Sequence, residues 1–204
     1  PHTSEERASD DYSEELFRTS RNMNLAESLV RESIQNSLDA KATSSDQVRV
    51  RFAIKSIPYS DLEPFLGELM PRLNSPDLVS INHPGTDGNV RILTVEDFGT
   101  VGLEGDPKRH DDPDRNSKDR FWEFWRNLGR GNRGDALRGR WGLGKSVFHI
   151  ASDIGTYFGL TVRKSDSRAL AMGLSQLKVH YLAGQRYESY GYYGVQDSLN
   201  FTRP

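Results

Sequence analysis

The sequence predicts an α+β fold: a two-layer sandwich in which a mixed, mostly antiparallel sheet is covered by helices on one face. The first observation is one strong amphipathic helix near the start of the chain, over residues 24–40. The second is a set of segments in which apolar and polar residues alternate, as they do in half-buried strands. The third is a run of such segments between residues 157 and 195, which we expect to form an antiparallel sheet.

The composition indicates one domain of 204 residues with long polar loops, since hydrophobic residues make up only 35% of the chain. A chain without cysteine cannot hold a disulfide framework or a thiolate zinc site. The net charge of -2 gives no overall electrostatic footprint for nucleic acid. No stretch approaches the roughly 20 apolar residues of a membrane-spanning helix. We therefore expect a cytoplasmic protein with no membrane segment.

Residue patterns in the first half of the chain predict a flexible arm, two helices and two strands. Residues 1–15 are polar and acidic without apolar period, so we expect a flexible arm followed by one domain over residues 16–204. The helix of residues 24–40 has Asn24 as its predicted N-cap. Three further elements follow by periodicity and turn chemistry: a strand over 48–56, a helix over 60–73 and a strand over 89–99.

The second half begins with a long charged loop, residues 103–118, and a short aromatic segment. Phe121, Trp122 and Trp125 predict one amphipathic helix whose function is core packing. The glycine- and arginine-rich segment that follows is too polar for a core strand and too rich in glycine for a stable helix. The remaining elements are predicted as a helix over 146–154 and strands over 157–163, 169–182 and 187–195.

The first helix carries a polar wedge. Glu32, Asn36 and Asp39 project at about 0°, 40° and -20° around its axis. A carboxamide oxygen is a suitable ligand for Mg²⁺ that is already bound by phosphates, and a carboxylate one turn away can deprotonate a water. The alternative is an ordinary amphipathic helix with a solvated polar face. In either case we expect an apolar stripe, on the side opposite the wedge, to pack on a sheet: Val30, Ile34 and Leu38.

An acidic loop follows the strand of residues 89–99. Asp97 stands at the end of the apolar run, and Gly99 and Gly102 come directly after it. A carboxylate at this place can accept a hydrogen bond from an exocyclic amine, and glycine lets the backbone approach a flat ring. The alternative is a simple strand-to-loop turn. The triplet of residues 97–99 also occurs in protein kinases, but no His-Arg-Asp catalytic loop precedes it, which excludes that fold.

The segment Gly139 to Ser146 reads GRWGLGKS and directly precedes a predicted helix. Clustered backbone N–H groups beside Lys145 are suited to phosphate binding. The string also matches the Walker A pattern, so a P-loop NTPase is a competing hypothesis. A Walker A loop follows a buried apolar strand, however, and the residues before Gly139 cannot form one.

These three segments together resemble the motifs of GHKL ATPases, with VRESIQNSLDAKAT similar to the N-box of the MutL, MORC and heat-shock chaperone branch. Residues 97–102 resemble the D-x-G-x-G box, and residues 139–144 resemble the G-x-x-G-x-G lid motif. The resemblance implies that Glu32 is the general base, that Asn36 binds Mg²⁺ and that Asp97 accepts from the adenine amine. It implies the remaining ATP-contacting positions from the two glycine motifs: Gly99, Gly102, Gly142, Gly144, Lys145 and Ser146.

Two features depart from the family pattern. The acidic loop has one extra residue between Gly99 and Gly102, so the adenine pocket can differ in shape. Lys145 directly after the lid glycines is not a general family feature.

The resemblance implies magnesium-dependent ATP binding and slow hydrolysis that drive a conformational switch, with a lid over about residues 103–145. Implied partners are a nucleotide-dependent homodimer and a protein client or a nucleic acid at the arginine-rich lid. The alternative function is a nucleotide-sensing scaffold without hydrolysis.

Overall fold

The computed structural model describes residues 24–79, 81, 88–109, 111, 119–126, 147–196 and 202–204. The chain is a mixed α+β protein with small antiparallel sheets and few helices in these residues. Its first described element is helix α2 (Leu25–Asp39), and the side chain of Asn24 caps it by accepting from the backbone N–H of Glu27 at 3.3 Å. This confirms both the helix and its predicted cap.

The buried face of α2 differs from the prediction. The apolar stripe is exposed, because Val30 and Ile34 each retain 40% of their accessible surface and Leu38 retains 53%. The helix instead packs through a neighbouring stripe of one leucine and three serines: Ser28, Leu29, Ser33 and Ser37. Serine permits close approach of the helix to its neighbours, and Ser37 satisfies its hydroxyl by donating to the Ser33 carbonyl at 2.8 Å.

Strands β1 (Arg49–Pro58) and β2 (Asn89–Phe98) form one long antiparallel pair in which all ten residues of each strand are in register. The first was predicted from its alternating pattern, and the second as an apolar strand that ends in an acidic, glycine-bearing loop. One face of the pair carries Phe52 opposite Val95, and Asp97 lies on that same face. The opposite face carries Phe98, covered by the guanidinium of Arg49 at 4.5 Å from the ring centroid.

A second antiparallel sheet joins β3 (Thr156–Val162), β4 (Ala169–Gln176) and β7 (Tyr190–Tyr193), in the order β3-β4-β7. Helix α5 (Arg120–Trp125) packs on it, as its aromatic residues predicted. The cluster is buried almost completely: Phe121, Trp125, Leu170, Met172 and Leu174. The indole of Trp125 stacks on Tyr157 at 5.4 Å between ring centroids, and its ring fills the space beside Gly159, whose side chain is only hydrogen.

The predicted helix over residues 60–73 is divided into α3 (Tyr59–Leu66) and α4 (Met70–Leu73). Gly67 ends α3, and Pro71, which has no N–H to donate, occupies the start of α4. The 3-10 helix η1 (Pro76–Leu78) follows. Together they build a second core cluster: Leu66, Leu69, Leu73, Leu78, Ile81 and Leu177.

Three other predicted elements differ in their boundaries. Helix α6 (Val147–Ile150) is only four residues long. The predicted strand over 169–182 is divided into β4 and β5 (His180–Leu182), and the strand over 187–195 into β6 (Gln185–Tyr187), β7 and the start of β8 (Val195–Gln196). β5 pairs with β6, and β8 pairs with β9 (Thr202–Arg203). Tight turns, which periodicity does not register, separate these short strands.

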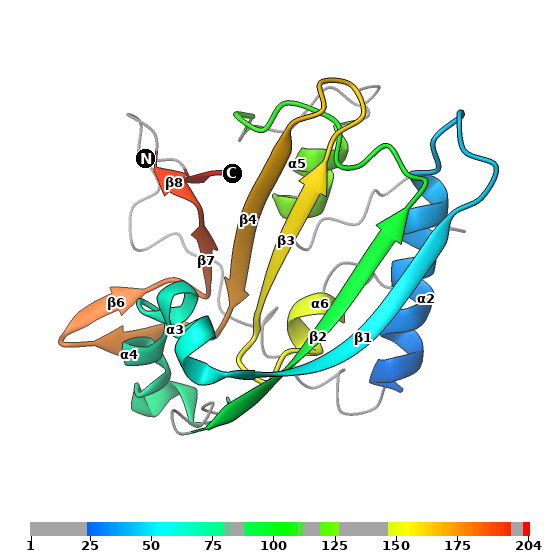
Figure 1. The fold of residues 1–204 in the computed structure, drawn as a ribbon. Coiled ribbons are helices and arrows are strands. Elements are labelled where there is room, and N and C mark those ends of the chain that lie inside the picture. Colours follow the sequence, from blue (N-terminus) through cyan, green and yellow to red (C-terminus); the bar gives the residue numbers. More distant parts are fainter. Residues whose placement is uncertain are drawn as a thin grey trace.

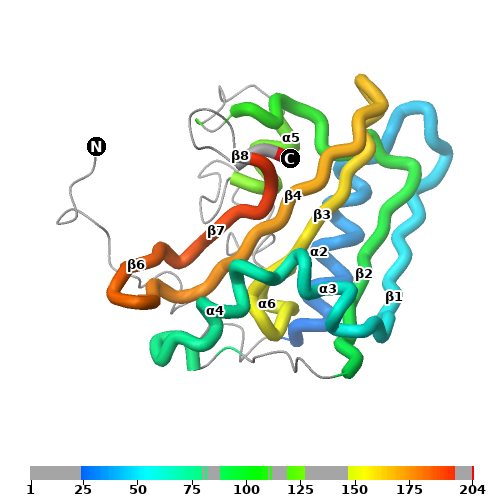
Figure 2. The backbone as a smooth tube through the Cα atoms, turned by 60° about the vertical axis from the view of Figure 1, so that its left-hand side comes forward, coloured from blue at the N-terminus to red at the C-terminus, as the bar shows by residue number. Residues whose placement is uncertain are grey.

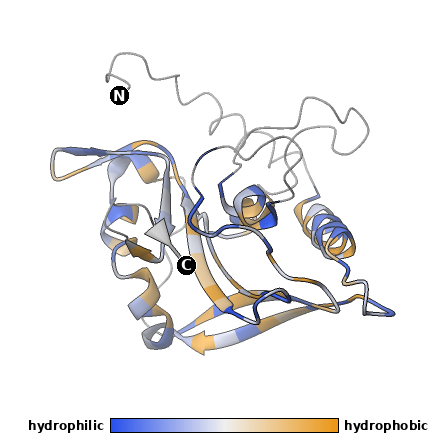
Figure 3. Ribbon diagram, turned by 90° about the horizontal axis from the view of Figure 1, so that it is seen from above, coloured by the Kyte–Doolittle hydropathy of each residue, from blue (hydrophilic) through white to orange (hydrophobic). Residues whose placement is uncertain are grey.

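Helices α2, α5 and α6 lie behind the strands of the two larger sheets, as Figure 1 shows. In Figures 1 and 2, β2 and β3 lie side by side, so that the strands follow one another as β7, β4, β3, β2 and β1. Every strand pair among the described residues is antiparallel, whereas a single mixed, mostly antiparallel sheet was predicted, and the hydrogen-bonded strands form four separate small sheets. Seen from above in Figure 3, α2 and α5 stand on the same side of the strands. No helix within the described ranges is long and apolar enough to span a membrane.

Candidate functional site

The end of helix α2 is joined to the acidic loop that follows β2. The backbone N–H of Ala42 donates to the Gly99 carbonyl at 2.9 Å, and that of Val101 donates to the Ala40 carbonyl at 2.9 Å. Lys41 and Thr100 form a β-bridge between these two bonds. Two motifs about 60 residues apart in the sequence are therefore held together by backbone hydrogen bonds.

Asp97 lies at this junction, and both oxygens of its carboxylate accept hydroxyl hydrogen bonds. Thr100 Oγ1 donates to Oδ1 at 3.0 Å, and Ser37 Oγ lies 3.1 Å from Oδ2. The Ser37 hydroxyl has a single proton, which it shares between Asp97 and the Ser33 carbonyl. A carboxylate oxygen accepts more than one hydrogen bond, so Asp97 is oriented and keeps the capacity to accept from a further donor.

Gly99 and Gly102 are required by the backbone of the acidic loop. Their φ angles are +83° and +75°, in the region that favours glycine. A Cβ on Gly99 would lie 2.3 Å from the Gln47 carbonyl oxygen, and one on Gly102 would lie 2.5 Å from the Val162 carbonyl oxygen. Close packing of the loop on neighbouring backbone thus accounts for both glycines, and contact with a nucleotide at these positions stays a prediction.

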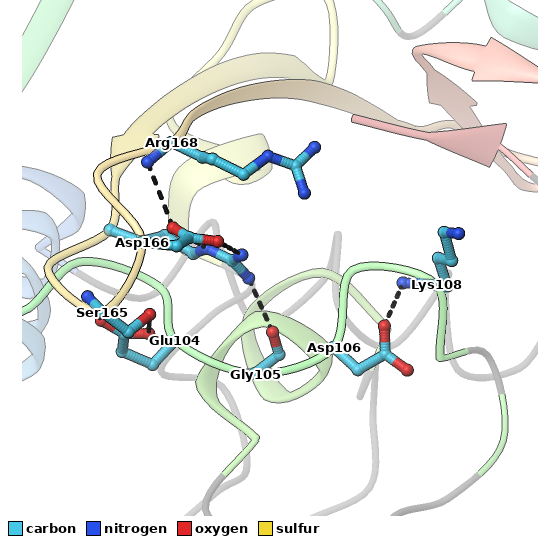
Figure 4. A network of polar contacts seen from close by, with 8 residues as sticks. Glu104, Gly105, Asp106, Lys108, Ser165, Asp166 and Arg168 are labelled. Atoms are coloured by element: carbon cyan, nitrogen blue, oxygen red, sulfur yellow. Dashed lines mark hydrogen bonds and ion pairs between the residues drawn. The ribbon is translucent and has the colours of Figure 1, made fainter.

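The far side of the loop is anchored to the turn between β3 and β4, as Figure 4 shows. The buried guanidinium of Arg163 donates to the Gly105 carbonyl at 2.7 Å and forms an ion pair with Asp166. Hydrogen bonding from Arg163 lowers the pKa of the Asp166 carboxyl from its ordinary value. Glu104 accepts from both the backbone N–H and the hydroxyl of Ser165. The chain beyond Asp97 is therefore fixed at both ends of the loop.

Glu32 and Asn36 flank the buried stripe of α2, and both are half-buried. Glu32 Oε1 accepts from the exposed Arg31 guanidinium at 3.2 Å. The Asn36 Nδ2 atom is buried and has no hydrogen-bond partner. Asp39, the third member of the predicted wedge, is exposed and accepts from Gln35 at 3.1 Å.

Asn36 fits the predicted role of a magnesium ligand. No cluster of three or more metal-binding side chains occurs in the part of the chain that the structure describes. A magnesium ion that is held mainly by nucleotide phosphates needs only one or two protein oxygens, so one carboxamide with a neighbouring carboxylate suffices. The Asn36 atom that lacks a partner is Nδ2, a donor that cannot bind a cation, so the magnesium role of the Asn36 carboxamide oxygen stays a prediction.

Buried polar atoms without partners gather on the helices behind the strands. Besides Asn36, they include Ser33 Oγ on α2, Trp122 Nε1 on α5 and both ring nitrogens of His149 on α6. Burial lowers the pKa of His149 to about 4, so its imidazole is neutral at pH 7. In a packed protein most such atoms are hydrogen-bonded, so each exception requires a physical explanation.

Sequence reasoning missed Ser33, Ser37 and His149. The only signal for His149 was a histidine within an otherwise apolar short helix, and the serines were hidden on the polar side of a helix pattern. Of the predicted residues, the structure brings Asp97 to the end of α2, the helix that carries Glu32 and Asn36.

The predicted lid is only partly described. The Leu103 N–H donates to Thr161 Oγ1 of β3 at 2.8 Å, and α5 belongs to the core. Asp119 is 3% exposed and caps α5 by accepting from the Trp122 N–H at 2.9 Å. The arm of residues 1–15 lies outside the described residues, and so do Gly142, Gly144, Lys145 and Ser146. Residues 110, 112–118 and 127–145 of the predicted lid also lie outside the described residues, so lid closure stays a prediction.

No protein-family model matches the sequence, and neither the curated proteins nor the solved structures contain a significant match.

Proposed function

We propose that this chain is a GHKL-type ATP-binding domain, an α+β sandwich that binds ATP with Mg²⁺ in the cytoplasm, hydrolyses it slowly and switches conformation as it does so. The observation that carries the proposal is the junction of Asp97 with α2, where Ser37 Oγ lies 3.1 Å from Asp97 Oδ2. It supports the proposal because the GHKL resemblance requires the N-box helix and the acidic loop to serve one site. The unpartnered buried polar atoms on the helices support a polar ligand on the same side of the strands.

Each residue has a separate task in this proposal. Asp97 accepts a hydrogen bond from the exocyclic amine of adenine, which distinguishes ATP from GTP. Asn36 would hold the Mg²⁺ ion, which when bound neutralises phosphate charge and orients the phosphates. Glu32, one turn from Asn36, takes the proton from the attacking water. Gly142, Gly144, Lys145 and Ser146 supply the phosphate contacts that the lid motif implies.

A nucleotide-sensing scaffold without hydrolysis is the second candidate, and the Arg31–Glu32 ion pair favours it. A carboxylate paired with a guanidinium has a weaker tendency to take a proton from water. Arg31 is exposed, however, and an exposed pair of this kind contributes little free energy, so a bound substrate can break it. Steady-state phosphate release from saturated protein separates the hydrolysing from the sensing function.

The ATP-driven switch that we propose has two classes of partner. One is a second copy of this chain, which would form a nucleotide-dependent homodimer. The other is a protein client or a nucleic acid that contacts the arginines of residues 126–140, because clustered arginines suit anionic partners. Light scattering with and without a non-hydrolysable ATP analogue tests the first.

Calorimetric titration with ATP tests the binding itself. The parent protein should bind ATP more tightly with Mg²⁺ than without it, and Asn36→Ala should remove this difference while it retains metal-free binding. Lys145→Ala tests the P-loop alternative, in which that lysine bridges the phosphates and its loss removes binding almost entirely. A silent Asn36→Ala together with a Lys145→Ala protein that does not bind would overturn the GHKL proposal in favour of the P-loop.

A further inference from the structure

His149 is a buried histidine that the fold itself does not use. It is the third residue of α6, which packs against α2, and only 3% of its surface is exposed. Neither ring nitrogen has a hydrogen-bond partner. Ser33, also 3% exposed on the packed face of α2, has an unpartnered hydroxyl as well. Burying unsatisfied polar atoms destabilises a fold, so their presence on two packed helices requires a reason.

His180, by contrast, is a buried histidine that contacts of the fold itself hold in place. It is 1% exposed, yet its Nδ1 lies 2.9 Å from the Lys178 carbonyl oxygen, and its ring stacks on Tyr187 at 5.5 Å between centroids. The surrounding fold therefore fixes the ring plane and Nδ1 of His180, and only its Nε2 lacks a partner. No such hydrogen bond holds His149.

We propose that His149 is a ligand-contacting residue whose imidazole hydrogen-bonds a polar group of the nucleotide bound beside α2. This inference rests on the proposed ATP-binding function, since it assigns a further recognition residue to that site. The neutral imidazole offers one N–H donor and one nitrogen acceptor. It therefore suits a ribose hydroxyl or a nitrogen of the base, and it introduces no charge of its own into a buried space. Binding would satisfy a polar group that the ligand-free fold leaves unpaired.

The test compares His149→Phe with His180→Phe. The phenyl ring retains the bulk of imidazole but lacks both nitrogens, so His149→Phe should unfold at the same or a higher temperature than the parent without ligand. Its affinity for Mg-ATP should fall by about 3- to 10-fold, the effect of one lost hydrogen bond. His180→Phe should bind Mg-ATP like the parent and unfold at a lower temperature. A merely structural role for His149 predicts the reverse, a lower unfolding temperature with unchanged affinity.

Nitrogen-15 spectra of the histidine rings in the parent give a second readout that needs no folded Phe variant. Addition of Mg-ATP should shift the ring signals of His149, assigned with His149→Gln, and leave those of His180 in place. Unmoved His149 signals, or unchanged affinity in His149→Phe, would overturn this inference while the ATP-binding function stands. A parent protein that binds no ATP would overturn both.

Discussion

Replacing Asp97 with asparagine tests the most specific assignment in the proposed site. Each carboxylate oxygen of Asp97 accepts one hydroxyl hydrogen bond, from Thr100 at 3.0 Å and from Ser37 at 3.1 Å. The amide of asparagine retains one acceptor oxygen and places an NH₂ group, which cannot accept from an amine, where the other oxygen stood. A hydrogen bond to a charged acceptor contributes about 1.5 to 3 kcal/mol, so ATP should bind about 10- to 100-fold more weakly.

The assay is calorimetric titration of the parent and Asp97→Asn with ATP and with GTP. GTP has a carbonyl in place of the adenine amine, so it should bind the parent much more weakly than ATP. Glu96→Gln is the matched control, because Glu96 neighbours Asp97 on β2 but faces the opposite side, where it accepts from Arg51 at 2.7 Å. Equal affinity of the parent for both nucleotides, or an ATP affinity that Asp97→Asn leaves unchanged, would refute the assignment.

Three further predictions concern the proposed base, the acidic loop and the buried histidine. Glu32→Ala should bind ATP but release phosphate about 10²- to 10⁴-fold more slowly, and an unchanged rate would exclude Glu32 as the base. Gly99→Ala should lower the free energy of unfolding in urea by about 2 kcal/mol or more, since it adds a Cβ 2.3 Å from a backbone oxygen at positive φ. Gly184 also has positive φ, but a Cβ there would have no atom within 4 Å, so Gly184→Ala should lower the free energy of unfolding less than Gly99→Ala. Equal losses of unfolding free energy in the two variants would show that packing at Gly99 is irrelevant. The pKa of His149 is lowered from 6.5 to about 4, so between pH 6.5 and pH 4 the unfolded chain binds more protons than the folded protein, and the free energy of unfolding decreases as the pH falls. The complete loss of unfolding free energy is about 3 kcal/mol, and His149→Phe should not show it in urea titrations between pH 4 and 7.5. Parallel curves of unfolding free energy against pH for the parent and His149→Phe would contradict this prediction.

The sequence by itself determined the elements whose signals are local. Helix α2 and its Asn24 cap, the paired strands β1 and β2, and the aromatic helix α5 follow from capping, alternation and apolar content within a few residues. The candidate residues Glu32, Asn36 and Asp97 were also chosen from the sequence alone, because their motifs occur in the order and spacing of a known family. What these residues bind stays a prediction.

Only the tertiary structure decided which surfaces meet. The apolar stripe of Val30, Ile34 and Leu38 was predicted to be the buried face of α2, but it is exposed. The helix packs mainly through serines, because small side chains allow close approach and their hydroxyls can bond to the helix backbone. The joining of Ala40 and Ala42 to the acidic loop, and the packing of α6, the short helix that carries His149, against α2, are contacts between segments far apart in the sequence. Sequence periodicity predicts neither contact, because it reports which face of one helix or strand is apolar and not the shape of the element that packs against it.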